Sequence, residues 1–386
     1  MKAGIYIHIP FCKSRCSYCD FATDVYRSND AVERYVSALC EEITNYELLI
    51  TNYKNRKPKT ENQIETIYFG GGTPSLLTVK QLEKILNSLH KTFSVEENIE
   101  FTLEMNPATV TLEKLQNFKS LGINRASFGV QTFDDKALKL LARGHDAADA
   151  RKTFELLRKA NFENISFDLI GGLPNQTLEN WNNNLTEALK LQPEHLSLYL
   201  LEIHEGTPLA EQIRSQRHPQ PDEDLAAAMY EMMLEMTAEK GFEQYEISNF
   251  SKPNLASKHN TKYWLCEPVF AFGVSAHSFD GQKRWSNERD TNQYVSLIEN
   301  GKSAITETTE LDKKQLSGEF AFLRLRLAKG LNLEEYEKKF GINLREDLKD
   351  DLTRLSEANL IKFDENFLKL TRQGMLYSNE VFAVFV

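Results

Sequence analysis

Apolar runs and amphipathic stretches alternate along the first half of the chain. Six short apolar runs have the length and the β-branched and aromatic content of strands; they are residues 4–10, 64–72, 99–107, 124–131, 165–174 and 195–203. Between them, helical patterns cover residues 30–50, 78–92, 111–121, 135–160 and 177–190, each long enough to connect two parallel strands. The pattern predicts an α/β fold in which residues 1–203 form an incomplete, six-stranded parallel barrel of the TIM type, with functional loops at the carboxyl ends of the strands.

The pattern becomes less regular after residue 203. Residues 204–224 are polar and contain prolines, which predicts an irregular connection at the start of a region that extends over 204–305. A helix is predicted over residues 223–240, where four methionines lie in one stripe: Met229, Met232, Met233 and Met236. We interpret this stripe as core packing rather than as a source of haem ligands.

The last part of the chain, residues 306–386, has its own pattern. Leucines recur with helical spacing over residues 344–355, and residues 360–371 contain two short apolar runs around an Asp-Glu-Asn turn. These elements predict a small winged-helix-like domain. Its charges of both signs favour packing or partner docking over DNA binding.

Composition and charge narrow the class of protein. The 386 residues are 41% hydrophobic and 26% charged, which is ordinary for a globular protein with a full core. Acidic residues outnumber basic residues by 56 to 46, and the absence of a basic block argues against nucleic acid as a partner. His8 and Pro10 interrupt the first apolar run, so neither a signal peptide nor a membrane span is predicted. We expect a cytoplasmic protein whose thiols are reduced.

Three of the five cysteines form a tight cluster directly after the first predicted strand. Cys12, Cys16 and Cys19 have the spacing C-x3-C-x2-C and fall on the rim of the barrel that carries chemistry. A [4Fe–4S] cluster usually has four thiolate ligands, so three cysteines leave one iron open to another ligand. The alternative is a zinc site completed by His8.

The cysteine motif, together with "YFGGGTPS" at residues 68–75, resembles the radical S-adenosylmethionine (SAM) superfamily. The resemblance implies that the SAM amino and carboxylate groups chelate the open iron, and that reductive cleavage of SAM yields a 5′-deoxyadenosyl radical. The glycine run is neither a P-loop nor a dinucleotide fingerprint. Its glycines suit a backbone that approaches a ligand closely.

Further motifs place the resemblance in the branch related to oxygen-independent coproporphyrinogen III oxidase. "HIPFC", "GGGTPS", "EMNP", "SFGVQTF", "RGH" and "DLIGGLP" follow one another in that order. The resemblance implies SAM contacts at Tyr6, Tyr18, Gly71, Gly72, Thr73, Glu104, Gln131, Arg143 and Asp168. Arg143 would pair with the carboxylate of SAM, and the side chains of Glu104 and Asp168 would accept hydrogen bonds from the ribose hydroxyls of SAM. The alternative is that these residues have structural roles only: Glu104 and Asp168 would cap helices or form salt bridges, and Arg143 would be a surface cation.

Two departures separate this chain from the coproporphyrinogen oxidases. Those enzymes carry a further cysteine in a C-x-C pair, whereas Cys19 is followed by Asp20 and Phe21, and they begin with a longer segment before the first strand. The chain resembles instead the HemW family of haem chaperones, which adds an H-N-x-x-Y-W signature, here "HNTKYW" from His259 to Trp264. This resemblance implies binding of haem and its transfer to acceptor haemoproteins, membrane-associated ones included, and leaves a homodimer open. The alternative is a radical SAM enzyme that acts on a porphyrin or porphyrinogen.

The signature supplies the candidate haem-binding residues His259, Tyr263 and Trp264. A neutral imidazole is a good axial ligand for haem iron, and aromatic rings can pack on a porphyrin. If this stretch is helical, His259 and Tyr263 share one face. The alternative is that His259 closes a loop while Trp264 anchors it to the barrel. We interpret Cys40 and Cys266 as lone buried cysteines, and we assign no catalytic residue.

Overall fold

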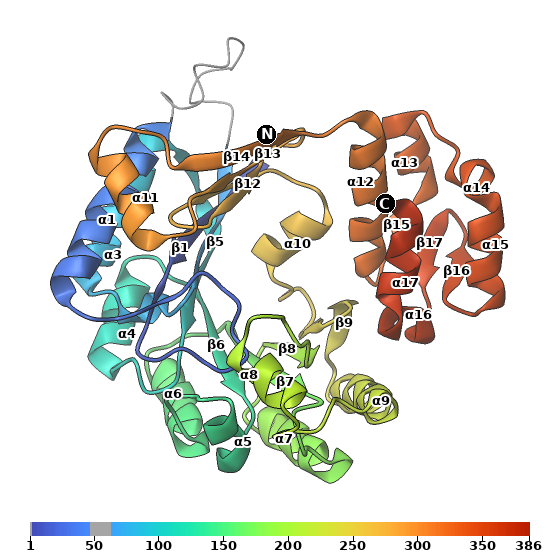
Figure 1. Ribbon diagram of the computed structural model, residues 1–386, viewed down its shortest axis with the longest axis horizontal. Coiled ribbons are helices and arrows are strands. Elements are labelled where there is room, and N and C mark those ends of the chain that lie inside the picture. Colours follow the sequence, from blue (N-terminus) through green and yellow to red (C-terminus); the bar gives the residue numbers. More distant parts are fainter. Residues whose placement is uncertain (1, 47–62) are drawn as a thin grey trace.

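A computed structural model describes residues 2–46 and 63–386 (Figure 1). Six parallel strands are consecutive neighbours in the central sheet and confirm the predicted barrel wall. They are β1 (Lys2–Ile9), β4 (Gln63–Gly71), β5 (Ser94–Met105), β6 (Arg125–Gln131), β7 (Ile165–Gly171) and β8 (His195–Leu200). Of the predicted bounds, those of β5 differ most, because this strand begins five residues earlier than its apolar run.

Each strand of the barrel alternates between an apolar and a polar face. On β6, for example, Ala126 and Phe128 belong to the main hydrophobic core, whereas Arg125 and Ser127 point the other way. The apolar side chains face helices outside the barrel, and the polar ones face its interior. The barrel is therefore stabilised on its outer face and has a polar inside.

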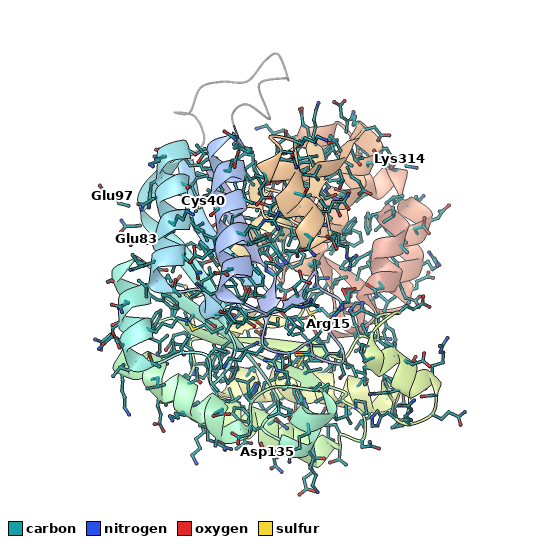
Figure 2. The ribbon with its side chains drawn as sticks, turned by 60° about the vertical axis from the view of Figure 1, so that its left-hand side comes forward. Arg15, Cys40, Glu83, Glu97, Asp135 and Lys314 are labelled. Atoms are coloured by element: carbon teal, nitrogen blue, oxygen red, sulfur yellow. The ribbon has the colours of Figure 1, made fainter. Side chains whose placement is uncertain are left out.

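Among the described residues, five helices cover the outer face, four of them at the predicted positions. They are α1 (Asn29–Thr44), α3 (Val79–Thr92), α4 (Leu112–Ser120), α6 (Ala147–Lys159) and α7 (Leu178–Lys190). Helices α1 and α3 pack side by side, with Cys40 on α1 (Figure 2). The last residues of the helix predicted over 30–50 lie outside the described part of the chain.

The single helix predicted over residues 135–160 is wrong. The chain forms α5 (Asp135–Leu140), leaves the helical path at Ala142, which has φ 54°, and begins α6 after Asp146. Asp146 accepts a hydrogen bond from the Asp149 amide in a capping box, which starts a new helix. The break matters because the loop between α5 and α6 carries Arg143.

Residues 204–224 are more ordered than their polar composition predicts. Thr207 caps α8 (Pro208–Arg214) within the segment expected to be irregular, and Leu209 and Ile213 bury its apolar side. The predicted methionine helix is confirmed as α9 (Glu223–Glu239). Met229 and Met233 are fully buried and the other two methionines pack against the same core, so the core-packing interpretation is confirmed.

The strands that follow lengthen the sheet at both edges. An antiparallel pair continues it beyond β8, one more parallel strand lies beside β1, and an antiparallel meander extends from that strand. These strands are β10 (Asn249–Ser251) and β9 (Glu243–Glu246) on one side, then β11 (Val269–Phe272), β12 (His277–Phe279), β13 (Lys283–Asn287) and β14 (Ile305–Glu310) on the other. Between the two sets lies a short helix, α10 (Lys258–Trp264), and α11 (Thr291–Glu299) follows β13.

The C-terminal part has a separate apolar cluster and a three-stranded antiparallel sheet. Its helices are α12 (Lys313–Arg326), α13 (Leu333–Phe340), α14 (Leu344–Asp347), α15 (Lys349–Glu357), α16 (Arg372–Leu376) and α17 (Ser378–Phe382), and its strands are β15 (Leu331–Asn332), β16 (Ile361–Asp364) and β17 (Phe367–Leu370). The hairpin of β16 and β17 is confirmed, and the predicted leucine helix is interrupted at Leu348.

Within the described residues, none of the helices combines the length and apolar character that crossing a bilayer requires.

Candidate functional site

The three clustered cysteines lie in the loop that follows β1. Cys12 ends the short strand β2 (Phe11–Cys12), which pairs with β3 (Asp24–Val25) and so closes the loop. The Cys19 amide donates to the Cys16 carbonyl at 3.3 Å, so a turn joins the second and third cysteines. Backbone pairing, rather than side-chain packing, holds these thiols in place.

Two polar side chains contact the sulfur atoms. The Thr73 hydroxyl lies 3.6 Å from Cys12 Sγ, and Arg143 Nη1 lies 3.4 Å from Cys16 Sγ. Burial raises the pKa of the Cys12 thiol to about 11 and also raises the pKa of Cys19, and neighbouring thiols add to both shifts. Such thiols ionise at neutral pH when a metal cation replaces their protons.

The three thiols can be compared with what each predicted metal site requires. No three His, Cys, Asp or Glu side chains within residues 2–46 and 63–386 are grouped as one metal ion requires. In a cubane cluster each thiolate binds a different iron, so its cysteines lie farther apart than the ligands of one ion but still surround one centre. His8, the proposed fourth zinc ligand, instead bonds Ala22 O at 2.8 Å through Nε2 and the Tyr6 hydroxyl at 3.1 Å through Nδ1.

The glycine run after β4 fits closely beneath the cysteine loop. A Cβ atom on Gly72 would lie 2.6 Å from Pro10 O and 2.8 Å from Phe11 O, so only glycine fits there. Gly71 has φ 107°, and its amide donates to Glu104 Oε2 at 3.2 Å. The close backbone approach in this structure is made to the loop that carries the cysteines, and the predicted approach to a ligand stays a prediction.

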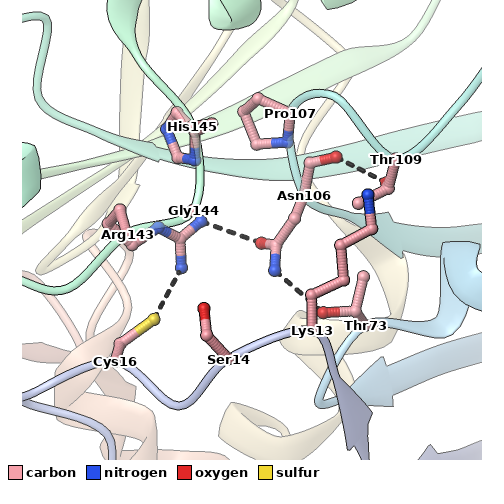
Figure 3. Close-up of a pocket in the computed structure, with 10 residues that line it drawn as sticks. All are labelled: Lys13, Ser14, Cys16, Thr73, Asn106, Pro107, Thr109, Arg143, Gly144 and His145. Atoms are coloured by element: carbon pink, nitrogen blue, oxygen red, sulfur yellow. Dashed lines mark hydrogen bonds between the residues drawn. The ribbon is translucent and has the colours of Figure 1, made fainter. Parts of the chain in front are cut away.

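A pocket opens between the cysteine loop, the segments that follow β4 and β5, and the loop between α5 and α6 (Figure 3). Arg143 Nη2 donates to Asn106 Oδ1 at 2.8 Å and to Gly129 O at 2.6 Å, while Nη1 points to Cys16. Asn106 in turn donates to the Thr73 hydroxyl at 2.8 Å. Arg143 is thus built into the pocket and is not a surface cation.

Two of the predicted SAM contacts are buried carboxylates. Glu104 accepts from the Tyr68 hydroxyl at 2.6 Å, and burial raises its pKa to about 7. Burial also raises the pKa of Asp168 to about 6, and this shift is partly offset by a hydrogen bond with Ser197. Within the described residues neither carboxylate caps a helix or forms an ion pair, and both are held by hydrogen bonds on the inner face of the barrel.

Two other predicted SAM contacts lie near Arg143, and a third, Tyr6, lies on the inner face of the barrel. Tyr18 lies in the cysteine loop, 3.5 Å from Arg143 Nη1. Gln131 ends β6 with φ 68°, and its side chain lies over Gly129. Tyr6 stacks on Tyr68 with ring centroids 6.1 Å apart, on the inner face of the barrel.

His259 lies at the opposite end of the barrel interior. The amides of Lys258 and His259 donate to Glu100 at 2.8 and 2.9 Å, which holds the first turn of α10 against the amino end of β5. The imidazole is 1% exposed, bonds the Thr66 hydroxyl at 2.9 Å through Nδ1 and the Tyr263 hydroxyl at 3.2 Å through Nε2, and stacks on Tyr68. The expected shared face of His259 and Tyr263 is confirmed.

The environment of His259 keeps its ring neutral. Burial lowers the pKa of His259 to about 3, and the positive charges of Lys262 and Arg125 contribute to this shift. Lys262 is itself buried and forms ion pairs with Glu65 and, at 2.8 Å, with Glu267. A neutral imidazole is the form that binds a metal.

Trp264 points away from His259. Arg326, at the end of α12, lies 4.4 Å above the indole ring, and Cys266 packs against the same C-terminal cluster. Trp264 therefore fastens α10 to the C-terminal part, and the suggestion that it anchors a loop to the barrel is wrong. Figure 1 shows α10 between the barrel strands and α12.

Two family models match the chain. The radical SAM superfamily model matches residues 6–187, and the HemN C-terminal domain model matches residues 311–377. The chain is 37% identical to the haem chaperone HemW of Bacillus subtilis over all of this chain and 99% of that protein. It is 31% identical to HemW of Haemophilus influenzae over 99% of this chain and 97% of that protein.

The chain belongs to the HemW family. Its fold is also that of coproporphyrinogen III oxidase (HemN) from Escherichia coli, with a TM-score of 0.85 over 100% of this chain and 89% of that one. Sequence identity to HemN is 22%, so this likeness concerns the fold alone.

Sequence reasoning missed several residues of this HemW-family interior. Thr66, Glu100 and Arg125 were not singled out, although all three are buried on the inner face. Their signal was the alternation of polar and apolar residues within the strands, as in Arg125-Ala-Ser127. Parallel strands buried on both faces are usually apolar throughout, so this alternation indicates a polar interior.

Proposed function

We propose that this protein is a haem chaperone, which binds haem and transfers it to an acceptor haemoprotein. The observation that carries the proposal is the end-to-end similarity to haem chaperones named HemW, at 37% identity to the Bacillus subtilis relative. A local likeness would be restricted to the radical SAM region, whereas this one includes α10 and the C-terminal part.

In this proposal His259 is the axial ligand of the haem iron. Its pKa of about 3 means that no proton competes with the metal at ordinary pH. When the Thr66 hydroxyl accepts a hydrogen bond from Nδ1–H, the lone pair of Nε2 is left for iron and the ring orientation is fixed. In this structure the Tyr263 hydroxyl bonds His259 Nε2, so haem binding requires that hydroxyl to leave the nitrogen. The tyrosine ring would then lie beside the porphyrin.

The cysteine end of the barrel would hold the second cofactor. Cys12, Cys16 and Cys19 would bind three irons of a [4Fe–4S] cluster, and Arg143 would pair with the carboxylate of SAM. Glu104 and Asp168 would accept hydrogen bonds from SAM hydroxyls. When bound, the cluster and SAM supply one-electron chemistry at the SAM sulfonium.

The partners in this proposal are haem and its acceptor, and the place is the cytoplasm. All five cysteines are free thiols, which supports a reducing compartment.

Anaerobic reconstitution followed by haem titration tests the proposal. Wild-type protein should bind haem with a defined stoichiometry, and His259→Ala should bind more weakly with a shifted absorbance spectrum, because the iron–nitrogen bond is lost while apolar contacts remain. Tyr263→Phe is the matched control, since it should keep the wild-type spectrum. An unchanged spectrum and affinity in His259→Ala would place the ligand elsewhere, with Cys266 and His277 next to test.

The alternative function, a porphyrinogen-modifying enzyme, is favoured only by the fold shared with HemN. We expect that reduced protein given SAM and coproporphyrinogen III forms no protoporphyrinogen, because Asp20 and Phe21 stand where the oxidases have their further cysteine. Stoichiometric decarboxylation of coproporphyrinogen III would contradict the chaperone proposal and favour the enzyme.

A further inference from the structure

Arg125 is a buried cation that lies near carboxylates but has no direct partner among the residues that the structure describes. It is 1% exposed on the inner face of β6, and no residue in the described part of the chain gives it a hydrogen bond or an ion pair. Thr102 lies beside it in register on β5, fully buried, and its hydroxyl also has no partner. Buried polar groups are almost always paired, and an unpaired buried guanidinium is especially costly. Two such groups side by side indicate a ligand site.

The carboxylates nearest to Arg125 do not pair with it. Glu104 is engaged by the Tyr68 hydroxyl and the Gly71 amide, and Asp168 by Ser197. Burial raises the pKa values of both carboxyls to about 7 and about 6, so they neutralise the arginine only in part near neutral pH. The histidine on β8, His195, is neutral, since burial lowers its pKa well below its usual range.

The interior next to Arg125 is aromatic and open to water. Tyr199, beside Asp168 on the inner face, exposes 40% of its surface, and Tyr263, bonded to His259, exposes 37%. An interior lined by tyrosines and containing a cation fits a flat ligand that carries a carboxylate.

The two inner arginines flank β6 at opposite ends. Arg143 follows the carboxyl end of the strand and contacts the cysteine loop, which suits the carboxylate of SAM. Arg125 begins the strand, at the end where α10 holds His259. The amino end of the interior therefore has an anion partner that the first cofactor does not use.

We propose that Arg125 binds a carboxylate of the ligand held at the α10 end of the barrel, and, resting on the proposed haem function, that this carboxylate is a haem propionate. A guanidinium pairs with a carboxylate through two parallel hydrogen bonds. Iron at His259 and a propionate at Arg125 fix the porphyrin at two points. Its in-plane orientation is then determined by charge and not by packing alone.

The test is a comparison of haem with haem dimethyl ester, in which both propionates are esterified. Reconstituted wild type should bind the ester at least about tenfold more weakly than haem, as expected for loss of charged hydrogen bonds. Arg125→Met should weaken haem binding by a similar factor and should no longer distinguish haem from the ester. Arg125→Lys, which keeps the charge but not the paired geometry, should lie between.

Stability and SAM binding separate this role from a structural one. Because Arg125 has no partner in the free protein, Arg125→Met should unfold at the same or a higher urea concentration than wild type. At pH 8.5, where Glu104 and Asp168 are ionised in both proteins, it should bind SAM as wild type does. The control Arg151→Met removes an exposed ion pair with Glu187 and should change neither ligand.

Several outcomes overturn the inference. Equal binding of haem and its ester by wild type would overturn it without any variant. A loss of SAM binding in Arg125→Met with haem binding intact would also overturn it, because the carboxylate bound by Arg125 would then belong to SAM. Lower stability with unchanged haem binding would make Arg125 structural. Wild type that binds neither porphyrin refutes the chaperone proposal itself, and so is distinct from these results.

Discussion

The two ends of the barrel interior hold their candidate ligands in different ways. At the cysteine end, Cys16 and Cys19 are partly exposed and are positioned by backbone turns and by one pairing of short strands. At the α10 end, His259 is 1% exposed, and both of its ring nitrogens are hydrogen-bonded. Under the proposed function, the cysteine end can take a cluster without a rearrangement, whereas at the α10 end the Tyr263 hydroxyl must first leave His259 Nε2.

This difference indicates which protein interactions each proposed ligand would have to replace on binding. Filling the cysteine end replaces protons on thiols and breaks little protein structure. Filling the α10 end breaks the hydrogen bond between His259 and Tyr263 and moves a side chain. Weak, reversible binding at the α10 end is what a protein that passes its ligand on requires.

The largest expected effect is at the cysteine end. Cys12→Ala, Cys16→Ala and Cys19→Ala should each abolish the iron–sulfur absorbance after anaerobic reconstitution, because three thiolates leave no spare ligand. Cys40→Ala and Cys266→Ala are the matched controls and should retain it. If reconstituted wild-type protein contained zinc and no labile sulfide, the assignment of a [4Fe–4S] cluster to the cysteine end would be wrong.

Two glycines test whether the ends are independent. Gly72→Ala should destabilise the fold by about 1–3 kcal/mol and lower cluster occupancy, because its Cβ would meet the Pro10 backbone at 2.6 Å. Gly4→Ala should disturb only the α10 end, since its Cβ would lie 2.7 Å from Thr66 Oγ1 and 3.2 Å from His259 Cε1.

Urea denaturation, iron content and haem titration measure these effects. Gly144→Ala is the control near the cysteine loop, where the nearest atom is the Ser14 hydroxyl oxygen at 3.5 Å. A loss of cluster in Gly4→Ala would show that the two ends are coupled.

The pH dependence of SAM binding should follow Glu104. Burial raises its pKa to about 7, so the carboxyl becomes an anion as the pH rises through 7, and affinity for the cationic SAM should rise several-fold. For the ligand-free fold the sign is opposite. Stability contributed by the protonated carboxyl is complete below the ordinary pKa and is lost as the pH rises through 7. Glu104→Gln should flatten both profiles, and a wild-type profile already flat would contradict the assignment.

The smallest effect is expected where α10 meets the C-terminal part. Trp264→Phe should reduce stability by about 0.5–1 kcal/mol through a weaker contact with Arg326, and should leave the haem spectrum unchanged. Chemical denaturation and haem titration of the same sample measure the two. A lost haem spectrum with unchanged stability would return Trp264 to the haem site that the sequence suggested.

The position of the cysteine loop could be predicted from the sequence. Its three cysteines are close together in the chain and directly follow the first strand, and their role as ligands of a cluster with one open iron stays a prediction. The six strands were also recognisable, because each is a compact apolar run. Arg143 could be placed by its resemblance to a family, but not its loop, since a single helix was predicted where Asp146 begins a second one.

The α10 end could not be assembled in this way. Thr66, Glu100 and Arg125 come from three strands, and only the register of the sheet brings them near His259. The sequence alone placed His259 and Tyr263 on one face. It could not place Trp264 on the other, because the partner, Arg326, lies more than sixty residues away in the chain.

The division of the barrel between an apolar outside and a polar inside has an evolutionary consequence. Because folding depends on the apolar outer face of the barrel, side chains on its inner face can be exchanged at little cost in stability. Substitutions in an apolar core cost much more. One scaffold can therefore acquire new ligands by successive single substitutions while remaining folded throughout.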